Sequence, residues 1–209
     1  MSRPNLFFIA GLSVYTLAVR LMPYALNHFG VSIHPNDTFY PWNFSPMSAC
    51  CLFGAAYLSR TAWAYLLPVA ILFVGDLGIW LLTGDRSMAF HNNMPFVYGS
   101  FLLIAFLGMW LREKRSLPRL WLTGLAGETC FFLITNFGVW YFANPATSRP
   151  PFDYTRDALG LLKCYTMGLP YFGNSLASTL FFSTVIFSPF LYQQRKAALA
   201  TQESPTLAA

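Results

Sequence analysis

The stretch TAWAYLLPVAILFVGDLGIWLLT, residues 61–83, decides the fold class of this chain. Asp76 is its only charged residue, and nearly all the others are apolar or small. A helix rises about 1.5 Å per residue, so a helix of this length can cross a hydrocarbon core of about 30 Å. We therefore predict that residues 61–83 span a membrane.

Further apolar runs lie on both sides of this segment. In chain order they are residues 5–26, 47–59, 97–111, 120–142 and 174–192. The run at 47–59 is rich in small residues, which let helices approach closely, but it is shorter than the roughly 20 residues of a usual span. It either starts deeper or enters the membrane only part way. A connector with a short surface helix at 157–167 is expected before the last run.

The composition of the whole chain agrees with a membrane protein. Charged residues make up 10% of its 209 residues and hydrophobic residues 56%, whereas a soluble domain carries roughly 25% charged residues. The net charge of +5 raises the question of nucleic acid. The basic residues cluster between the apolar runs, however, as the positive-inside rule predicts, so we expect no nucleic-acid partner. The four cysteines form no C-x-x-C motif, so neither a metal site nor a disulfide framework is expected.

The basic residues also orient the six predicted spans. With a cytoplasmic N-terminus, the inside carries Arg3, Arg60, Arg112, Lys114, Arg115, Arg119, Arg195 and Lys196. The outside carries only Arg86, Arg149, Arg156 and Lys163. This asymmetry favours both termini in the cytoplasm. The prediction is an all-α, polytopic membrane helix bundle: one transmembrane domain over residues 1–196 and a polar, disordered cytoplasmic tail over 197–209.

Three ionisable residues lie inside the apolar runs: Arg20, Asp76 and Glu128. A charge near the bilayer centre costs about 2.5–3.5 kcal/mol on insertion scales, so such residues tend to face the protein interior and to have partners. Arg20 and Asp76 fall in the outer halves of their spans, where they could pair. Such a pair would either form part of a ligand site or only link two helices. Glu128 is a candidate for proton coupling or for a helix contact.

The predicted outer connectors combine polar and aromatic residues. They hold every histidine of the chain, among them His91, and also Trp42 and Asn43. Apolar walls with a few hydrogen-bonding groups are typical of a small-molecule pocket. An interfacial aromatic belt explains the tryptophans equally well. The spacing of the histidines matches no metal-ligand pattern.

Motifs of common enzymes are absent from the sequence. It contains no G-x-S-x-G, no H-E-x-x-H and no P-loop. We therefore expect no enzymatic activity, no cofactor and no ATP site of its own. Uphill transport would then draw its energy from an ion gradient or from a partner.

Four sequence blocks carry a family resemblance. They are YPWNFSPMSACCLFGAAYL (40–58), VYGSFLLIAFLGMWLR (97–112), FFLITNFGVW (131–140) and LLKCYTMGLPYFGNSLASTLFF (161–182). They resemble a family of bacterial membrane proteins that bears a domain-of-unknown-function label and is described in terms of transport. That family is similar to the S components of energy-coupling-factor (ECF) vitamin transporters.

The resemblance implies an S-component-like bundle of six transmembrane helices in the bacterial inner membrane. It would bind a vitamin-like or micronutrient-like molecule from the outside, and an ATPase module would energise its uptake. The resemblance adds the Asn136 and Asn174 regions to the loop of Asn43. The predicted substrate pocket comprises Arg20, Trp42, Asn43, Asp76, His91, Asn136 and Asn174.

Two other hypotheses remain open from the sequence. A non-transporting membrane scaffold would be a closed, well-packed bundle without an outward pocket. A membrane enzyme acting on lipid would need His and Asp side chains that converge near one membrane surface.

Overall fold

The computed structural model describes residues 6–31, 44–144 and 153–203. Within these ranges every regular element is a helix, which confirms the all-α prediction. The elements are α1 (Leu6–His28), α2 (Met47–Tyr57), α3 (Thr61–Thr83), α4 (Arg86–Ala89), α5 (Met94–Gly108), the 3-10 helix η2 (Met109–Arg112), α6 (Leu117–Phe142) and α7 (Ala158–Glu203).

Five segments of the described chain are long and apolar enough to cross a membrane. They are Phe7–His28, Thr61–Thr83, Arg86–Arg112, Leu117–Phe142 and Ala158–Ala200. The last differs most from expectation, because α7 joins the predicted surface helix, the last span and residues 197–203 of the predicted tail into one helix of 46 residues. Pro170 and Pro189 lie inside this helix. Membrane helices tolerate proline where neighbouring groups satisfy the freed carbonyls.

The helix α2 corresponds to the short run at 47–59. Its 11 residues make a helix about 16 Å long, which is too short to cross the hydrocarbon core. Residues 47–56 are all buried. It packs against α1, α3, α5, α6 and α7. A short helix in the centre of the bundle therefore stands where the sequence predicted a span.

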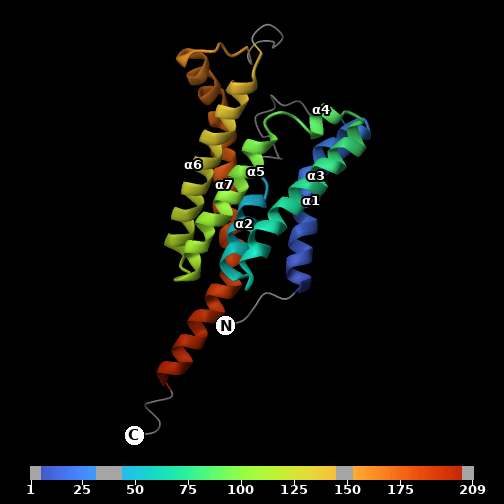
Figure 1. Ribbon diagram of the computed structural model, residues 1–209. Coiled ribbons are helices and arrows are strands. Elements are labelled where there is room, and N and C mark those ends of the chain that lie inside the picture. The colour runs from blue at the N-terminus through green and yellow to red at the C-terminus, as the bar shows by residue number, and fades with distance from the viewer. Residues whose placement is uncertain (1–5, 32–43, 145–152, 204–209) are drawn as a thin grey trace.

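The longer helices form two flanks around α2 (Figure 1). We call α1 and α3, which pack along each other, the α1–α3 flank, and α6 and α7 the α6–α7 flank. α5 packs against α2, α3 and α6 and so joins the flanks. The start of α1 and the end of α7 lie at the same end of the bundle (Figure 1).

Glycines permit the close helix contacts. A Cβ at Gly108 of α5 would lie 2.8 Å from the Cβ of Ala55 and 3.2 Å from the Cα of Leu52, both on α2. A Cβ at Gly75 of α3 would lie 2.6 Å from Cδ of Arg20. Small residues at helix contacts let backbones approach in membranes. The composition of the 47–59 run predicted such a contact for α2, and Ala55 makes it with Gly108.

Two arginines cap the C-terminal end of α2. Nε and Nη2 of Arg112 donate to the carbonyls of Ala55 and Leu58, at 2.6 and 3.0 Å. Nη2 of Arg115 donates to the carbonyl of Ala56 at 2.7 Å. The last carbonyls of a helix lack partners within the helix, and cations near them are favourable. The basic cluster that the sequence offered as an orientation signal thus also holds the end of α2.

Candidate functional site

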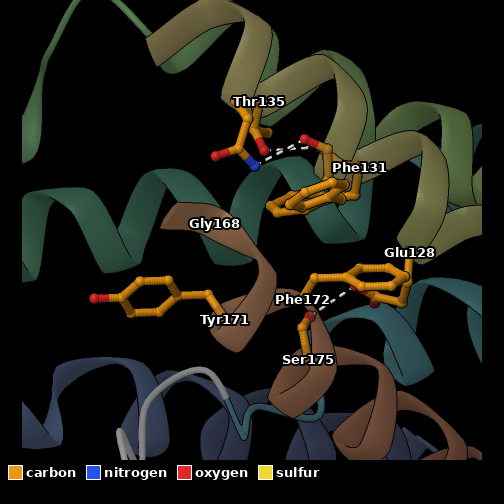
Figure 2. Close-up of a pocket in the computed structure, with 9 residues that line it drawn as sticks. Glu128, Phe131, Thr135, Gly168, Tyr171, Phe172 and Ser175 are labelled. Atoms are coloured by element: carbon orange, nitrogen blue, oxygen red, sulfur yellow. Dashed lines mark hydrogen bonds between the residues drawn. The ribbon is translucent and has the colours of Figure 1, made fainter. Parts of the chain in front are cut away.

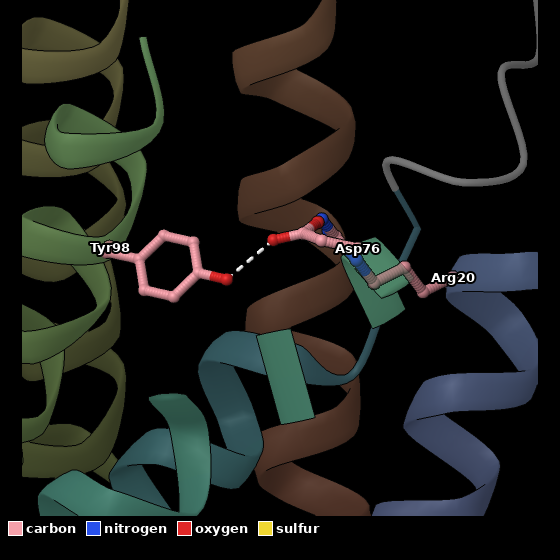
Figure 3. Close-up of polar contacts among 3 residues, drawn as sticks. All are labelled: Arg20, Asp76 and Tyr98. Atoms are coloured by element: carbon pink, nitrogen blue, oxygen red, sulfur yellow. Dashed lines mark hydrogen bonds and ion pairs between the residues drawn. The ribbon is translucent and has the colours of Figure 1, made fainter. Parts of the chain in front are cut away.

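The first set of embedded polar side chains joins α1, α3 and α5 (Figure 3). Nη2 of Arg20 forms an ion pair with Oδ1 of Asp76. The hydroxyl of Tyr98 donates to Oδ2 of Asp76 at 2.6 Å. Asp76 is only 2% exposed. Each oxygen of this buried carboxylate therefore has a partner, and three helices are linked through one side chain.

Tyr98 was not predicted to take part in this set. The sequence showed that Arg20 and Asp76 were expensive to bury and would seek partners. A tyrosine within an apolar run gives no such signal, because its ring packs well whether or not its hydroxyl finds an acceptor.

The second set centres on Glu128 of α6. This carboxyl group is 1% exposed. Its Oε1 accepts a hydrogen bond from Thr179 and its Oε2 from Ser175, both at 2.7 Å. Both donors lie on α7, one helical turn apart. Among the described side chains, no lysine, arginine or histidine forms an ion pair with Glu128.

Glu128 lies at the edge of a cavity between α6 and α7 (Figure 2). Its volume is about 170 Å³. The residues that line it are Glu128, Phe131, Phe132, Thr135, Asn136, Gly168, Tyr171, Phe172 and Ser175. Nδ2 of Asn136 donates to the carbonyl of Phe132 at 2.8 Å. The cavity thus combines aromatic walls with one buried carboxyl group and one amide.

A second, more open cavity of about 400 Å³ lies where the α4–α5 connector meets the end of α6. Its polar lining comes from His91, Asn92, Asn93 and Tyr154. Nδ2 of Asn93 donates to the carbonyl of Thr135 at 3.3 Å, which ties the connector to α6. Burial raises the pKa of Tyr154 to about 12, so its hydroxyl stays neutral and serves as a hydrogen-bonding group.

A comparison with protein families assigns the chain. Residues 1–203 match the model described as "Family of unknown function (DUF6580)". The chain belongs to this family. No curated protein and no solved structure matches it. The assignment agrees with the domain-of-unknown-function label expected from the four sequence blocks. The likeness to S components stays a prediction.

In this DUF6580 protein the predicted pocket residues fall into separate places. Arg20 and Asp76 pair with each other on the α1–α3 flank, whereas Asn136 lines the α6–α7 cavity and His91 the open one. Asn174 is half-buried on α7, next to Ser175, and lines neither cavity. Trp42 and Asn43 lie outside the described residues. The structure therefore unites Arg20 with Asp76 but does not place either of them with Asn136 in these cavities.

The role of Glu128 in the DUF6580 bundle is clearer from the structure than from the sequence. The GLAGETC context (residues 124–130) predicted a helix contact, and the contact with α7 is present. The aromatic cavity beside it was not foreseen. The only sign of this site in the sequence was a carboxyl group within an apolar run. The side chains that bind it come from α7, more than forty residues away in sequence.

Proposed function

We propose that this protein is a membrane-embedded subunit that binds a small solute and takes part in its uptake. The observation that carries the proposal is the α6–α7 cavity, where a buried carboxyl group and an amide meet aromatic walls. Pockets with apolar walls and a few orienting polar groups are the usual form of small-molecule sites. The scaffold hypothesis expects a closed bundle and is less consistent with this cavity.

The proposal includes a topology. The chain crosses the membrane six times, and α2, which is too short to cross the hydrocarbon core by itself, forms only part of the second crossing. The end of the bundle that carries Arg112, Arg115 and the C-terminal part of α7 faces the cytoplasm. The concentration of basic residues at that end supports this orientation. The solute would then enter from the opposite end, and an ATPase module of the ECF type would be the energising partner. No chemical step on the solute is part of the proposal.

A stability screen tests solute binding. The full-length protein in detergent is heated with a panel of vitamins and other small nutrients. A ligand of the folded state raises the melting temperature. Tyr171→Ala, which alters the cavity wall, should reduce that shift. Tyr192→Ala, which removes an exposed tyrosine from the same helix outside the cavity, should preserve it.

Uptake of the stabilising solute in cells tests the transport part. Deleting the gene should reduce accumulation of the labelled solute, and the wild-type gene should restore it. The absence of any stabilising solute, together with unchanged uptake in the deletion strain, would contradict the proposal and favour the scaffold. A green fluorescent protein fused after the last residue tests the orientation. The fusion should fluoresce if the C-terminus lies in the cytoplasm, because that protein folds there.

A further inference from the structure

The two hydroxyl groups that bind Glu128 differ from many other helix hydroxyls of this protein, including others on α6 and α7. Hydroxyls such as those of Thr135, Thr166 and Thr184 donate to the carbonyl four residues earlier in their own helix. Ser175 and Thr179 donate across the helix contact to Glu128 instead. One turn of α7 therefore presents two donors at the right spacing to hold both oxygens of one carboxyl group.

The hydrogen bonds to Glu128 leave part of its capacity unused. An ionised carboxylate offers about four lone-pair sites, and the two hydroxyls occupy two of them. A charge in a membrane-spanning segment is costly unless it is paired. The described part of the chain supplies no ion pair for Glu128, in contrast to Asp76. A cation from outside the chain would complete its surroundings.

The walls beside Glu128 suit an organic cation. Phe131, Phe132, Tyr171 and Phe172 line the cavity, and the rings of Phe132 and Phe172, whose centroids lie 5.0 Å apart, pack against each other as one wall. Aromatic faces attract cations through the ring quadrupole, and cages of such rings recognise quaternary ammonium groups. A metal ion would find fewer ligands here, because the described residues contain no group of three or more His, Cys, Asp or Glu placed to share one.

The size of the cavity limits the ligand. Its volume of about 170 Å³ is close to that of an engineered apolar cavity of about 150 Å³ that holds benzene. An ammonium group with a few methyl or hydroxyethyl substituents has this size. Larger cofactor-like vitamins would need the helices to separate.

We propose that the cavity between α6 and α7 binds a small alkylammonium cation, with Glu128 as its counter-charge and the phenylalanine rings as its walls. This inference names the solute class for the proposed function, and its role in uptake rests on that function. Binding itself follows from the cavity and does not depend on transport.

The test compares charged and neutral probes of equal shape. The full-length protein in detergent is titrated with tetramethylammonium, with choline and with the neutral isostere of choline, 3,3-dimethylbutan-1-ol, at constant ionic strength. We expect the two cations to raise the melting temperature in a saturable way, at concentrations up to about 10 mM, and the neutral isostere to have little effect.

Two variants locate the effect. Glu128→Gln keeps the size of the side chain but removes the charge, and it should lower the apparent affinity for tetramethylammonium at least about ten-fold, the factor that corresponds to about 1.4 kcal/mol. Glu113→Gln is the matched control, because Glu113 is an exposed partner of Arg119 on the loop before α6 and should leave binding unchanged. If Glu128→Gln fails to fold, Phe172→Leu alters only the wall and should also weaken binding.

Three outcomes would overturn the inference. They are equal stabilisation by the neutral isostere, an unchanged shift in both cavity variants, and no shift with either cation. Uptake of labelled choline separates this inference from the proposed function. Binding without uptake would leave the cation site standing and contradict transport. Stabilisation by neutral solutes alone, reduced in Tyr171→Ala, would leave the proposed function standing and remove the cation site.

Discussion

Asp76 and Glu128 are both buried carboxyl groups on helices long and apolar enough to cross a membrane, yet their surroundings differ. On the α1–α3 flank, Asp76 has an arginine on one oxygen and a tyrosine hydroxyl on the other. On the α6–α7 flank, Glu128 has two hydroxyls, no ion pair within the described residues, and a cavity beside it. The difference indicates that Asp76 links helices with its charge already balanced, whereas Glu128 is placed to meet a further group.

The largest expected effect is on the α1–α3 flank. Arg20→Met would leave Asp76 buried without a counter-charge, and breaking a buried pair costs about 3–5 kcal/mol. Because the Arg20 side chain is 30% exposed, we expect about 3 kcal/mol, the lower end of this range. A denaturing-detergent titration, which gives the free energy of unfolding, measures this loss of stability.

The double variant Arg20→Met/Asp76→Asn controls for the loss of side-chain packing. It should recover part of the lost stability, because it removes the uncompensated charge. An unfolding free energy equal to that of the wild type in Arg20→Met would contradict the structural role given to the pair.

The next effect concerns the helix that joins the two flanks. α5 carries Tyr98 and lies against α2 through Gly108, so the geometry around Asp76 depends on this contact. Gly108→Ala would place a methyl group 3.2 Å from the backbone of Leu52, and overpacking of this kind costs about 1–3 kcal/mol. The midpoint of thermal unfolding would fall.

Gly99→Ala is the matched control on α5. No atom lies within 4 Å of the added Cβ, so this variant should be neutral or more stable by up to about 1 kcal/mol through helix propensity. Equal midpoints for the two variants would show that α5 can shift on α2 without loss of stability.

A smaller effect is expected on the α6–α7 flank in the absence of ligand. Glu128→Gln retains an acceptor for one hydroxyl and a donor for the other, so the cost should be about 1 kcal/mol or less. The same denaturing titration measures it, beside Asp76→Asn, which should cost more because it leaves Arg20 without its counter-charge. If Glu128→Gln lowered the free energy of unfolding as much as Arg20→Met, the proposed difference between the two carboxyl groups would be wrong.

The smallest effect on stability belongs to an exposed ion pair, between Asp153 and Lys163 (2.6 Å). The hydrogen bond from Lys163 lowers the pKa of Asp153. This pair therefore contributes stability above the unfolded aspartate pKa of about 4, and loses it as the pH falls through the lower folded value. Melting temperatures of wild type and Asp153→Asn should differ slightly at about pH 6 and converge towards about pH 3.

Lys163→Met should remove the same pH-dependent contribution to stability. Both side chains of this pair are more than a third exposed, so screening by water keeps the effect small. An Asp153→Asn variant as damaging as Arg20→Met would mean that pairing, and not burial, controls the cost of losing a charge in this protein.

Several features of the fold were predictable from residue chemistry. Apolar runs of sufficient length indicated the helices that can cross a membrane. The cost of a charge in hydrocarbon indicated that Arg20 and Asp76 needed partners and could pair with each other. The continuity of α7 was not predictable, because Pro170 and the polar residues before it favour a break, while contacts with α6 support one helix.

The candidate site shows the same division. The sequence drew attention to Glu128 and the family resemblance to Asn136, but neither indicated that the two share a cavity. The predicted pocket instead joined Asn136 with Arg20 and Asp76, which pair on the other flank. A polar side chain in an apolar segment needs a hydrogen-bonding or charged partner. Its polarity does not determine which helix supplies that partner, because this depends on how the helices are rotated against one another.

By itself, the sequence determined that this chain forms a helical bundle with helices long and apolar enough to cross a membrane, because hydropathy and run length act on each segment separately. Only the tertiary structure decided that a short helix occupies the centre, that arginines cap its end, and that two hydroxyls of α7 hold Glu128 beside an aromatic cavity. These features depend on the rotation and spacing of helices against one another. Close packing of small residues sets that geometry, which cannot be predicted from the hydropathy of a single segment.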